Sequence, residues 1–459
     1  HATLRCVGVG KCRDPQGSPT MCPSYQVTRE EKHSTRGRAR LLFEMLQGEV
    51  VTDGWQSEEV YDALDLCLAC KGCTSDCPVG VDMPTYKSEF LYHHYQSPGR
   101  WRPRYAYAFG YIDKAARLAS LAPELVNFAT QTPVLRRVAK LAAGVDRRRP
   151  LPKFAPMTLQ EWFRQRGGTA NPTGRPVVLF PDTFNNYLHT DVGVACVEAI
   201  EAAGWRVIMP DRHICCGRPL YDYGFLDSAG RYLQRVLDEL RPYVRDDIPV
   251  VGMEPSCLAV FKDELRKMLP HDDDAARLAR NAHHFGEFFT TFGIEPPRLD
   301  GEALLWGHCH HRATGGMSPE KKILEQSGLS VKELKGGCCG LAGSWGFEKG
   351  KYKISMECGE QALLPAVRDA PGGALVVADG FSCKTQIADA RVGKRALHTG
   401  QVFAMARAGE PDGGVPGRPV PPARRRAART LAGVAAIALP AAAALAVAAR
   451  AASRAAARG

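Results

Sequence analysis

The chain has 459 residues, enough for two or three domains, and its 45% hydrophobic and 24% charged residues are ordinary for a globular protein. The net charge of +11 does not indicate nucleic-acid binding, because eight of the 60 basic residues and none of the acidic ones lie from Arg418 onward. Sixteen cysteines without a secretory signal at the start favour metal sites over disulfides. The first residue is His1 rather than Met, which is typical of a fragment or a processed product.

The most informative stretch is a cysteine run that begins at Cys67. Cys70 and Cys73 follow at intervals of three, and Cys77 comes next with Pro78 directly after it. This is the spacing of ferredoxin-type runs that bind cubane iron–sulfur clusters. Zinc usually takes two separated pairs of ligands, and a set of disulfides needs no such regular spacing. The run therefore predicts a 4Fe-4S cluster.

A second, imperfect run lies near the start of the chain, where Val9 stands in the place of a middle cysteine. In two-cluster ferredoxins the Cys-Pro cysteine of each run binds the other cluster. We therefore expect one complete 4Fe-4S cluster on Cys67, Cys70, Cys73 and Cys22, and an incomplete one on Cys6, Cys12 and Cys77. The missing corner suits a three-iron cluster, a water or a side chain such as His33. The alternative is that Cys6 and Cys12 are remnants of a lost cluster.

Helical patterns fill the first part of the chain. Ser34 and Ser57 are expected helix N-caps, and Gly48 is expected to end the helix that follows Ser34. The pattern stays helical from Met83 to about Arg166, and a Gly/Pro/polar linker spans residues 167–174. Residues 1–166 are thus predicted to form a helical 4Fe-4S ferredoxin-type domain.

Beyond the linker, short apolar runs alternate with helical patterns, which is typical of parallel α/β units. The expected strands are 177–180, 207–209, 250–252, 303–306 and 374–378. Cys215-Cys216-Gly217 recurs as Cys338-Cys339-Gly340, so we expect two copies of one unit, at residues 175–298 and 299–408. The predicted fold class is α+α/β: a helical two-cluster ferredoxin module, two repeated parallel α/β Cys-Cys-Gly units and a low-complexity tail.

The two copies differ in the metal ligands that they offer. The second offers four thiolates from three loops: Cys309, Cys338, Cys339 and Cys383. The first offers Cys215, Cys216 and Cys257, because Thr183 replaces its first cysteine. These sets predict a metal or cluster at the carboxyl ends of the strands. The alternative is that Cys-Cys-Gly marks a tight turn with buried thiols.

Other cysteines and histidines have simpler interpretations. Cys196 and Cys358 lie in helical patterns without partners and are predicted to be core residues. His284 and His398 recur in both copies, where they either contact the site or make structural hydrogen bonds.

The chain ends in a Pro/Ala/Arg-rich tail, residues 411–459. Residues 431–449 carry no charge and are long enough for a membrane-associating helix. Eleven of them are alanine and one is Pro440, so a disordered or surface-lying tail is the alternative.

Several of these motifs together resemble one family. Met21–Tyr25, Ser34–Arg40, the Cys67 run and Cys338–Phe347 are similar to the iron–sulfur half of bacterial FAD-linked oxidases that act on D-2-hydroxy acids, such as lactate, glycolate and 2-hydroxyglutarate. The paired Cys-Cys-Gly units resemble those of heterodisulfide reductase B subunits. The resemblance covers about residues 1–405. Glu254 and Gly380 stand where the full Cys-Cys-Gly motif has a further cysteine, which argues against a five-cysteine cluster.

The resemblance implies an electron-transfer role. Electrons would pass from FAD, on a domain or partner chain not present here, through 4Fe-4S clusters to a quinone or other carrier, at the cytoplasmic side of the cell membrane. No catalytic residue is predicted, because the substrate would bind in the flavin part. The alternatives are a separate iron–sulfur subunit of a glycolate-oxidase or heterodisulfide-reductase-like complex, and a non-catalytic zinc-binding scaffold.

Overall fold

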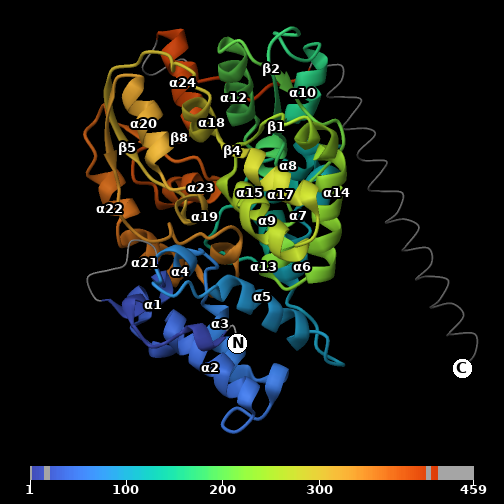
Figure 1. Ribbon diagram of the computed structural model, residues 1–459, viewed down its shortest axis with the longest axis vertical. Helices are drawn as coiled ribbons and strands as arrows, with labels where there is room; N and C mark the ends of the chain where they lie inside the picture. The colour runs from blue at the N-terminus through green and yellow to red at the C-terminus, as the bar shows by residue number, and fades with distance from the viewer. Residues whose placement is uncertain (1–2, 15–20, 410–414, 422–459) are drawn as a thin grey trace, which may run out of the picture.

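The structure is a computed structural model that describes residues 3–14, 21–409 and 415–421. It has a helical module at one end and two four-stranded parallel sheets side by side above it, each accompanied by helices (Figure 1). The predicted combination of a helical part with parallel α/β structure is therefore confirmed.

The helical module is formed by the first five helices: α1 (Pro23–Thr28), α2 (Thr35–Gln47), α3 (Glu58–Asp65), α4 (Gly72–Ser75) and α5 (Met83–His94). The predicted caps are present. Ser34 Oγ accepts a hydrogen bond from Gly37 N at 2.9 Å, and Ser57 Oγ accepts one from Val60 N at 3.3 Å. Gly48 ends α2 with a φ of 73°, as the glycine at this position predicts.

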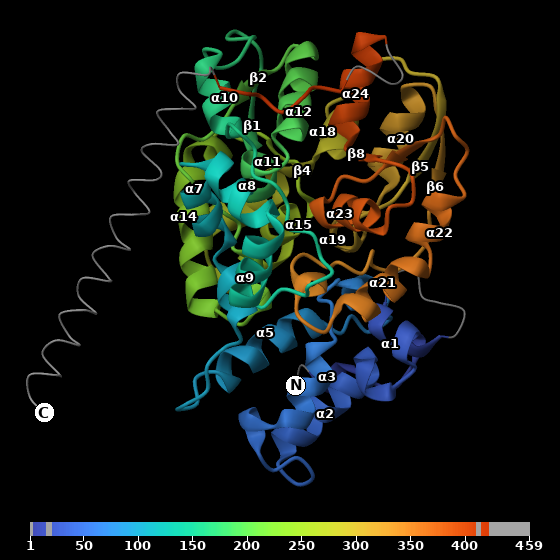
Figure 2. The same ribbon diagram turned by 180° about the vertical axis from the view of Figure 1, so that it is seen from behind.

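Five further helices connect this module to the first sheet: α6 (Arg104–Gly110), α7 (Ile112–Ala119), α8 (Pro123–Gln131), α9 (Pro133–Ala143) and α10 (Leu159–Gln165). Pro123 and Pro133 are the first residues of their helices, where a missing N–H costs nothing. Figure 2 shows α7, α8 and α9 on the outside of the molecule, beside α14.

The first sheet has the strand order β2-β1-β3-β4 and is parallel throughout. Its strands are β1 (Pro176–Phe180), β2 (Arg206–Ile208), β3 (Val250–Gly252) and β4 (Ala282–His284). Its helices are α11 (Thr183–Tyr187), α12 (Thr190–Ala202), α13 (Arg218–Asp222), α14 (Leu226–Arg245), α15 (Pro255–Ala259), α16 (Leu265–Met268), α17 (Asp273–Asn281) and α18 (Phe285–Thr291).

The second sheet has the order β6-β5-β7-β8, which is the same order when strands are counted within each sheet. Its strands are β5 (Gly301–Leu305), β6 (Leu329–Glu333), β7 (Leu375–Val377) and β8 (Ala396–Leu397). Its helices are α19 (Cys309–Thr314), α20 (Ser318–Gln326), α21 (Tyr352–Glu360), α22 (Leu363–Arg368), α23 (Phe381–Ala390) and α24 (Thr399–Ala408). One apolar cluster contains side chains from both sheets, including Val177 and Leu179 of β1 and Leu305 and Val377 of the second sheet.

The five predicted strands are confirmed as β1, β2, β3, β5 and β7, whereas three strands were not predicted from the sequence. β4 and β8 have three residues and two residues, too few for an apolar pattern. β6 lies at the edge of its sheet and exposes Ser330, Lys332 and Glu333, so it lacks an apolar run.

Among the described residues, we find no helix with the length and apolar character that crossing a membrane requires. The predicted tail helix at residues 431–449 lies outside the described residues.

Candidate functional site

The Cys67 run begins in the loop that follows α3 and continues through the short helix α4 to Cys77. Ala69 and Lys71 both have left-handed backbones, with φ of 50° and 59°, which non-glycine residues adopt only where the surroundings hold them. Cys67, Cys70 and Cys73 are buried, and Cys77 is half-buried. Ala69 and Lys71 flank Cys70, so the backbone turns sharply on both sides of this cysteine.

This loop contacts two different apolar clusters. Cys67 and Cys73 belong to the core of the helical module, together with Cys12 and Cys22. Cys70 and Leu68 belong instead to the core of the second α/β unit, which contains Cys309, Cys338, Cys339 and Cys383. One short loop therefore carries cysteines into both predicted cysteine sites.

The N-terminal cysteines are only partly brought together. Cys22 donates to Cys12, and this hydrogen bond lowers the pKa of the Cys12 thiol to about 6. The Cys22 sulfur also accepts a hydrogen bond from Thr35 N at 3.0 Å. Cys6 is half-buried, and Val9, in the place of the absent cysteine, is 60% exposed. The exchange of Cys22 and Cys77 between two clusters stays a prediction.

His33, suggested from the sequence for the missing corner, is buried. Its Nδ1 lies 2.8 Å from Thr28 Oγ1, so this ring nitrogen already has a partner. Burial lowers the pKa of His33 to about 4, which keeps the imidazole neutral.

The second unit brings its four predicted cysteines together. The sulfurs of Cys309 and Cys338 lie 4.0 Å apart. Cys338 and Cys383 both donate to Cys339, and these hydrogen bonds hold the pKa of Cys339 well below its ordinary value. All four are buried. Three separated segments of the chain thus bring four thiols together, and the thiolate form of Cys339 is favoured. This set of sulfur donors fits an iron–sulfur cluster or a thiophilic metal.

The first unit has a weaker set. Cys216 donates to Cys257 at 3.0 Å, with Cys215 next to it in the chain. Glu254, in the place of a motif cysteine, is buried and accepts a hydrogen bond from Phe381 N of the second unit at 2.8 Å. Burial and the nearby Asp182 raise the pKa of Glu254 to about 7. This carboxyl therefore joins the two units.

A cavity of about 100 Å³ lies between the two units and the Cys67 loop. It is mainly apolar, and both sets of cysteines contribute to its wall. The residues of the first unit that line it include Thr183, Cys215, Cys216 and Cys257, and those of the second include His308, Cys309 and His310.

All sixteen cysteines are free thiols. Among the described residues, no three Cys, His, Asp or Glu side chains surround a point where a single metal ion would bind. A 4Fe-4S cluster makes a different demand, because it takes four cysteines at its separate irons. The Cys67 loop offers three buried thiols, those of Cys67, Cys70 and Cys73, and Cys12 and Cys22 lie in the same apolar cluster as two of them.

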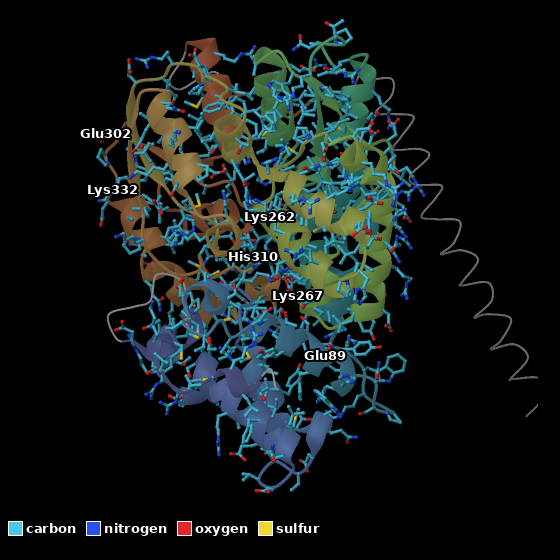
Figure 3. All side chains as sticks on the ribbon, viewed as in Figure 1. Glu89, Lys262, Lys267, Glu302, His310 and Lys332 are labelled. Atoms are coloured by element: carbon cyan, nitrogen blue, oxygen red, sulfur yellow. The ribbon has the colours of Figure 1, made fainter. Side chains whose placement is uncertain are left out.

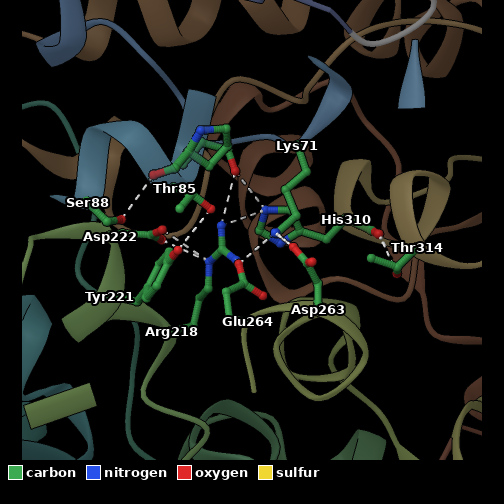
Figure 4. Close-up of polar contacts among 12 residues, drawn as sticks. Lys71, Thr85, Ser88, Arg218, Tyr221, Asp222, Asp263, Glu264, His310 and Thr314 are labelled. Carbon is green, nitrogen blue, oxygen red and sulfur yellow. Dashed lines mark hydrogen bonds and ion pairs between the residues drawn. The ribbon is translucent and has the colours of Figure 1, made fainter. Parts of the chain in front are cut away.

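A buried ion network at the junction of the three parts was not predicted from the sequence (Figure 4). Lys71, inside the Cys67 run, is 1% exposed and pairs with Asp263 and with Glu264, whose Oε1 lies 2.8 Å from Lys71 Nζ. Arg218 pairs with the same Glu264. His310 Nε2 lies 2.9 Å from the carbonyl oxygen of Ala69, and Figure 3 shows this histidine near the middle of the molecule.

This network attaches the loop to both α/β units. Arg218 Nη2 of the first unit donates to the Ala69 carbonyl at 3.2 Å, and His310 of the second unit contacts the same carbonyl. The only signal for this network in the sequence was a lysine within the cysteine run. The sequence could not show whether that lysine is exposed or buried in an ion pair.

The recurring histidines have equivalent structural positions. His284 and His398 each precede a helix, α18 and α24, with capping boxes completed by Glu287 and Gln401. His398 Nδ1 accepts a hydrogen bond from Gly400 N at 3.0 Å. These contacts account for His398 as a helix cap, whereas the ring of His284 stacks on that of His311 and its buried Nε2 has no hydrogen-bond partner.

Two family models match parts of the chain. Residues 2–81 match the 4Fe-4S dicluster domain, and residues 181–262 match the cysteine-rich domain. The two matches and the fold thus define a protein with an iron–sulfur dicluster module followed by cysteine-rich α/β structure.

Curated relatives give the more particular likeness. The chain is 27% identical to D-2-hydroxyglutarate dehydrogenase of Pseudomonas putida over 433 residues, which is 84% of this chain and 42% of that protein. It is 28% identical to lactate utilization protein A of Bacillus subtilis over 44% of this chain and 89% of the relative. It is 22% identical to the glycolate oxidase iron-sulfur subunit of Escherichia coli over 84% of this chain and 89% of the relative.

The chain thus spans less than half the length of the D-2-hydroxyglutarate dehydrogenase that it matches. The predicted resemblance to the iron–sulfur portion of such oxidases is confirmed, and the match to the 4Fe-4S dicluster domain supports the predicted 4Fe-4S clusters.

Proposed function

We propose that the chain carries electrons away from the flavin in an FAD-dependent D-2-hydroxy-acid dehydrogenase, of the type that oxidises 2-hydroxyglutarate, glycolate or lactate. The flavin would belong to a domain or partner chain not present here. The similarity of this chain to a D-2-hydroxyglutarate dehydrogenase over 84% of the chain's length supports this substrate class.

The observation that carries the proposal is the double contact of the Cys67 loop. Its Cys67 and Cys73 pack with the N-terminal cysteines, whereas its Cys70 packs with Cys309 in the second unit. Iron–sulfur clusters take up and release single electrons with little rearrangement. The loop has buried cysteines in both apolar clusters, and this supports its use as a connection between two such clusters.

We further propose the domain limits 1–166, 175–298 and 299–408, with the two α/β units as copies of one another. Their identical strand order supports this, and so do the paired Cys-Cys-Gly motifs and the equivalent histidine caps. The acceptor we propose is a quinone or another carrier, at the inner face of the cell membrane.

A second candidate is a separate iron–sulfur subunit beside a flavoprotein. The glycolate oxidase iron-sulfur subunit favours it, because this chain covers 89% of that relative. The coding sequence upstream of His1 distinguishes the two arrangements, because a flavin domain in the same reading frame means a single fused protein.

The proposal is tested by anaerobic purification. We expect a brown protein that bleaches with dithionite and gives paramagnetic resonance signals of reduced 4Fe-4S clusters. A colourless protein that contains zinc alone would refute electron transfer and support the zinc scaffold.

The ligand exchange is tested with two variants. We expect Cys22→Ala to remove the complete cluster of the ferredoxin-type module and Cys77→Ala to affect mainly the incomplete one. Cys196→Ala is the matched control, because Cys196 is a buried cysteine in α12 and outside every predicted ligand set. Loss of the complete cluster in Cys77→Ala, with Cys22→Ala intact, would refute the exchange.

A further inference from the structure

The helices α8 and α9 are unusual in what they bury. The single buried side chain of α9 is Lys140, and that of α8 is Pro123. On α9 the exposed fractions of Val134, Val138 and Leu141 are 68%, 62% and 64%. These residues follow the i, i+4, i+7 spacing of one helix face, so the helix presents an apolar stripe to the outside instead of to a core.

More than half of the exposed large hydrophobic side chains lie in one part of the chain. Nine of the 16 exposed large hydrophobic side chains lie between residues 101 and 141, and among the described residues from 142 to 409 there is none. Besides the α9 stripe, Phe128 of α8 is 62% exposed, and Leu118 and Leu121 at the end of α7 are 55% and 50% exposed. The three helices lie together on the outer surface (Figure 2). We call the exposed side chains of α7–α9 the apolar face.

The charges around the apolar face are mostly positive. Arg104, Lys114, Arg117 and Arg137 are exposed on α6, α7 and α9. Residues 104–143 contain two acidic side chains. One of these, Asp113, is buried and accepts hydrogen bonds from Tyr232 Oη, at 3.0 and 2.9 Å. Long basic side chains beside an apolar stripe can keep their charged ends in water while the aliphatic stems lie along apolar material.

We propose that the apolar face of α7–α9 binds the surface of an anionic lipid bilayer. Exposed Leu, Val and Phe beside Arg and Lys are the composition of helices that lie in the membrane interface. Protein interfaces draw more on Tyr, Trp and Met, and leucine and valine are under-represented among their main contacts. The apolar face therefore fits a lipid surface better than a protein partner.

The proposal goes beyond electron transfer and does not depend on it. It nevertheless places the bilayer close to the redox path. The helix α6 contacts both α9 and α13, and Arg218 of α13 donates to the carbonyl of Ala69 in the Cys67 loop. A lipid-soluble acceptor would thus be available near that loop.

The experiment uses the full chain and co-sedimentation with vesicles. We expect binding to vesicles of phosphatidylcholine with phosphatidylglycerol, weak binding to phosphatidylcholine alone, and release by high salt. The variant Val134→Ser/Val138→Ser/Leu141→Ser should lower the partition coefficient at least about tenfold. Arg117→Gln and Arg137→Gln should each lower it about fivefold.

The matched control is Leu46→Ser/Val50→Ser, because these two side chains are also exposed, by 55% and 74%, but lie in the helical module. The control should bind like the unaltered chain, and all variants should retain their thermal midpoint. Equal binding by the triple serine variant would overturn the proposal, since the vesicles would then be held elsewhere, such as by residues 422–459. Absence of binding by the unaltered chain would also overturn it. That result is expected if the apolar face binds a flavoprotein instead of a bilayer.

Discussion

Replacement of Lys71 by Met tests how the Cys67 loop is held. The ammonium of Lys71 is 1% exposed and lies between Asp263 and Glu264. Met has a similar length and removes the charge, so both carboxylates lose a partner, although Asp263 is 26% exposed and keeps its pair with Lys267. Glu264 is itself 1% exposed and keeps only Arg218.

Removal of one partner from a buried ion pair typically costs about 3–5 kcal/mol, because the remaining charge stays buried. For a protein part of about 150–250 residues, each kcal/mol shifts the thermal midpoint by about 2–4 °C. We therefore expect Lys71→Met to lower the midpoint by at least about 6 °C.

Lys267→Met is the matched control, because Lys267 also pairs with Asp263 but is 42% exposed. An exposed pair contributes about 0–1 kcal/mol, so this variant should unfold within about 3 °C of the unaltered chain. The measurement is anaerobic thermal unfolding followed by circular dichroism, with iron content determined for every sample. Arg218→Met, outside the cysteine run, should repeat the loss at full iron content. Equal midpoints for Lys71→Met and Lys267→Met, or a normal midpoint for Arg218→Met, would refute the reasoning.

Two further predictions concern the buried carboxyl of Glu348 and the glycines of the Cys-Cys-Gly motifs. Glu348 is buried, and burial raises its pKa to about 8. Between about pH 4.5 and 8, the unfolded chain has therefore lost the carboxyl proton of Glu348 while the folded chain keeps it. Its ionisation therefore lowers stability over that range, and Glu348→Gln should gain up to about 5 kcal/mol over the unaltered chain at pH 9 but not at pH 4; a pH-independent difference in urea unfolding would contradict this. Gly340 has a φ of 91°, and a Cβ there would lie 2.0 Å from the carbonyl oxygen of Ser355, whereas a Cβ on Gly217 would lie 3.2 Å from Tyr232 Cβ. We expect Gly340→Ala to cost more than about 4 kcal/mol and Gly217→Ala about 1–2 kcal/mol, and equal losses in chemical unfolding would contradict the contacts.

Local signals were predictable from the sequence, and contacts between distant segments were not. The caps at Ser34 and Ser57 depend on one side chain and the next turn, and both are confirmed. The cysteine spacing likewise predicted which thiols lie in one loop. It carried no information that Cys70 packs in the same apolar cluster as Cys309, because that contact joins segments far apart in the chain.

The same limit applies to polar residues of the junction. Arg218 and His310 are ordinary residues after a Cys-Cys-Gly motif and in a His-Cys-His-His run, and only the fold places both on the carbonyl of Ala69. The short strands β4 and β8 were likewise missed because their pairing, not their composition, makes them strands.

The attachment of the Cys67 loop also has a consequence for biosynthesis. His310 is 241 residues after Ala69, so this wall of the loop is synthesised long after the cysteines emerge. At translation rates of about 5–20 residues per second, the interval is roughly 10–50 s. During that interval the thiol of Cys70 lacks the residues of the second unit that later bury it. Iron and sulfide can therefore be delivered to the nascent chain before the α/β units close over the loop.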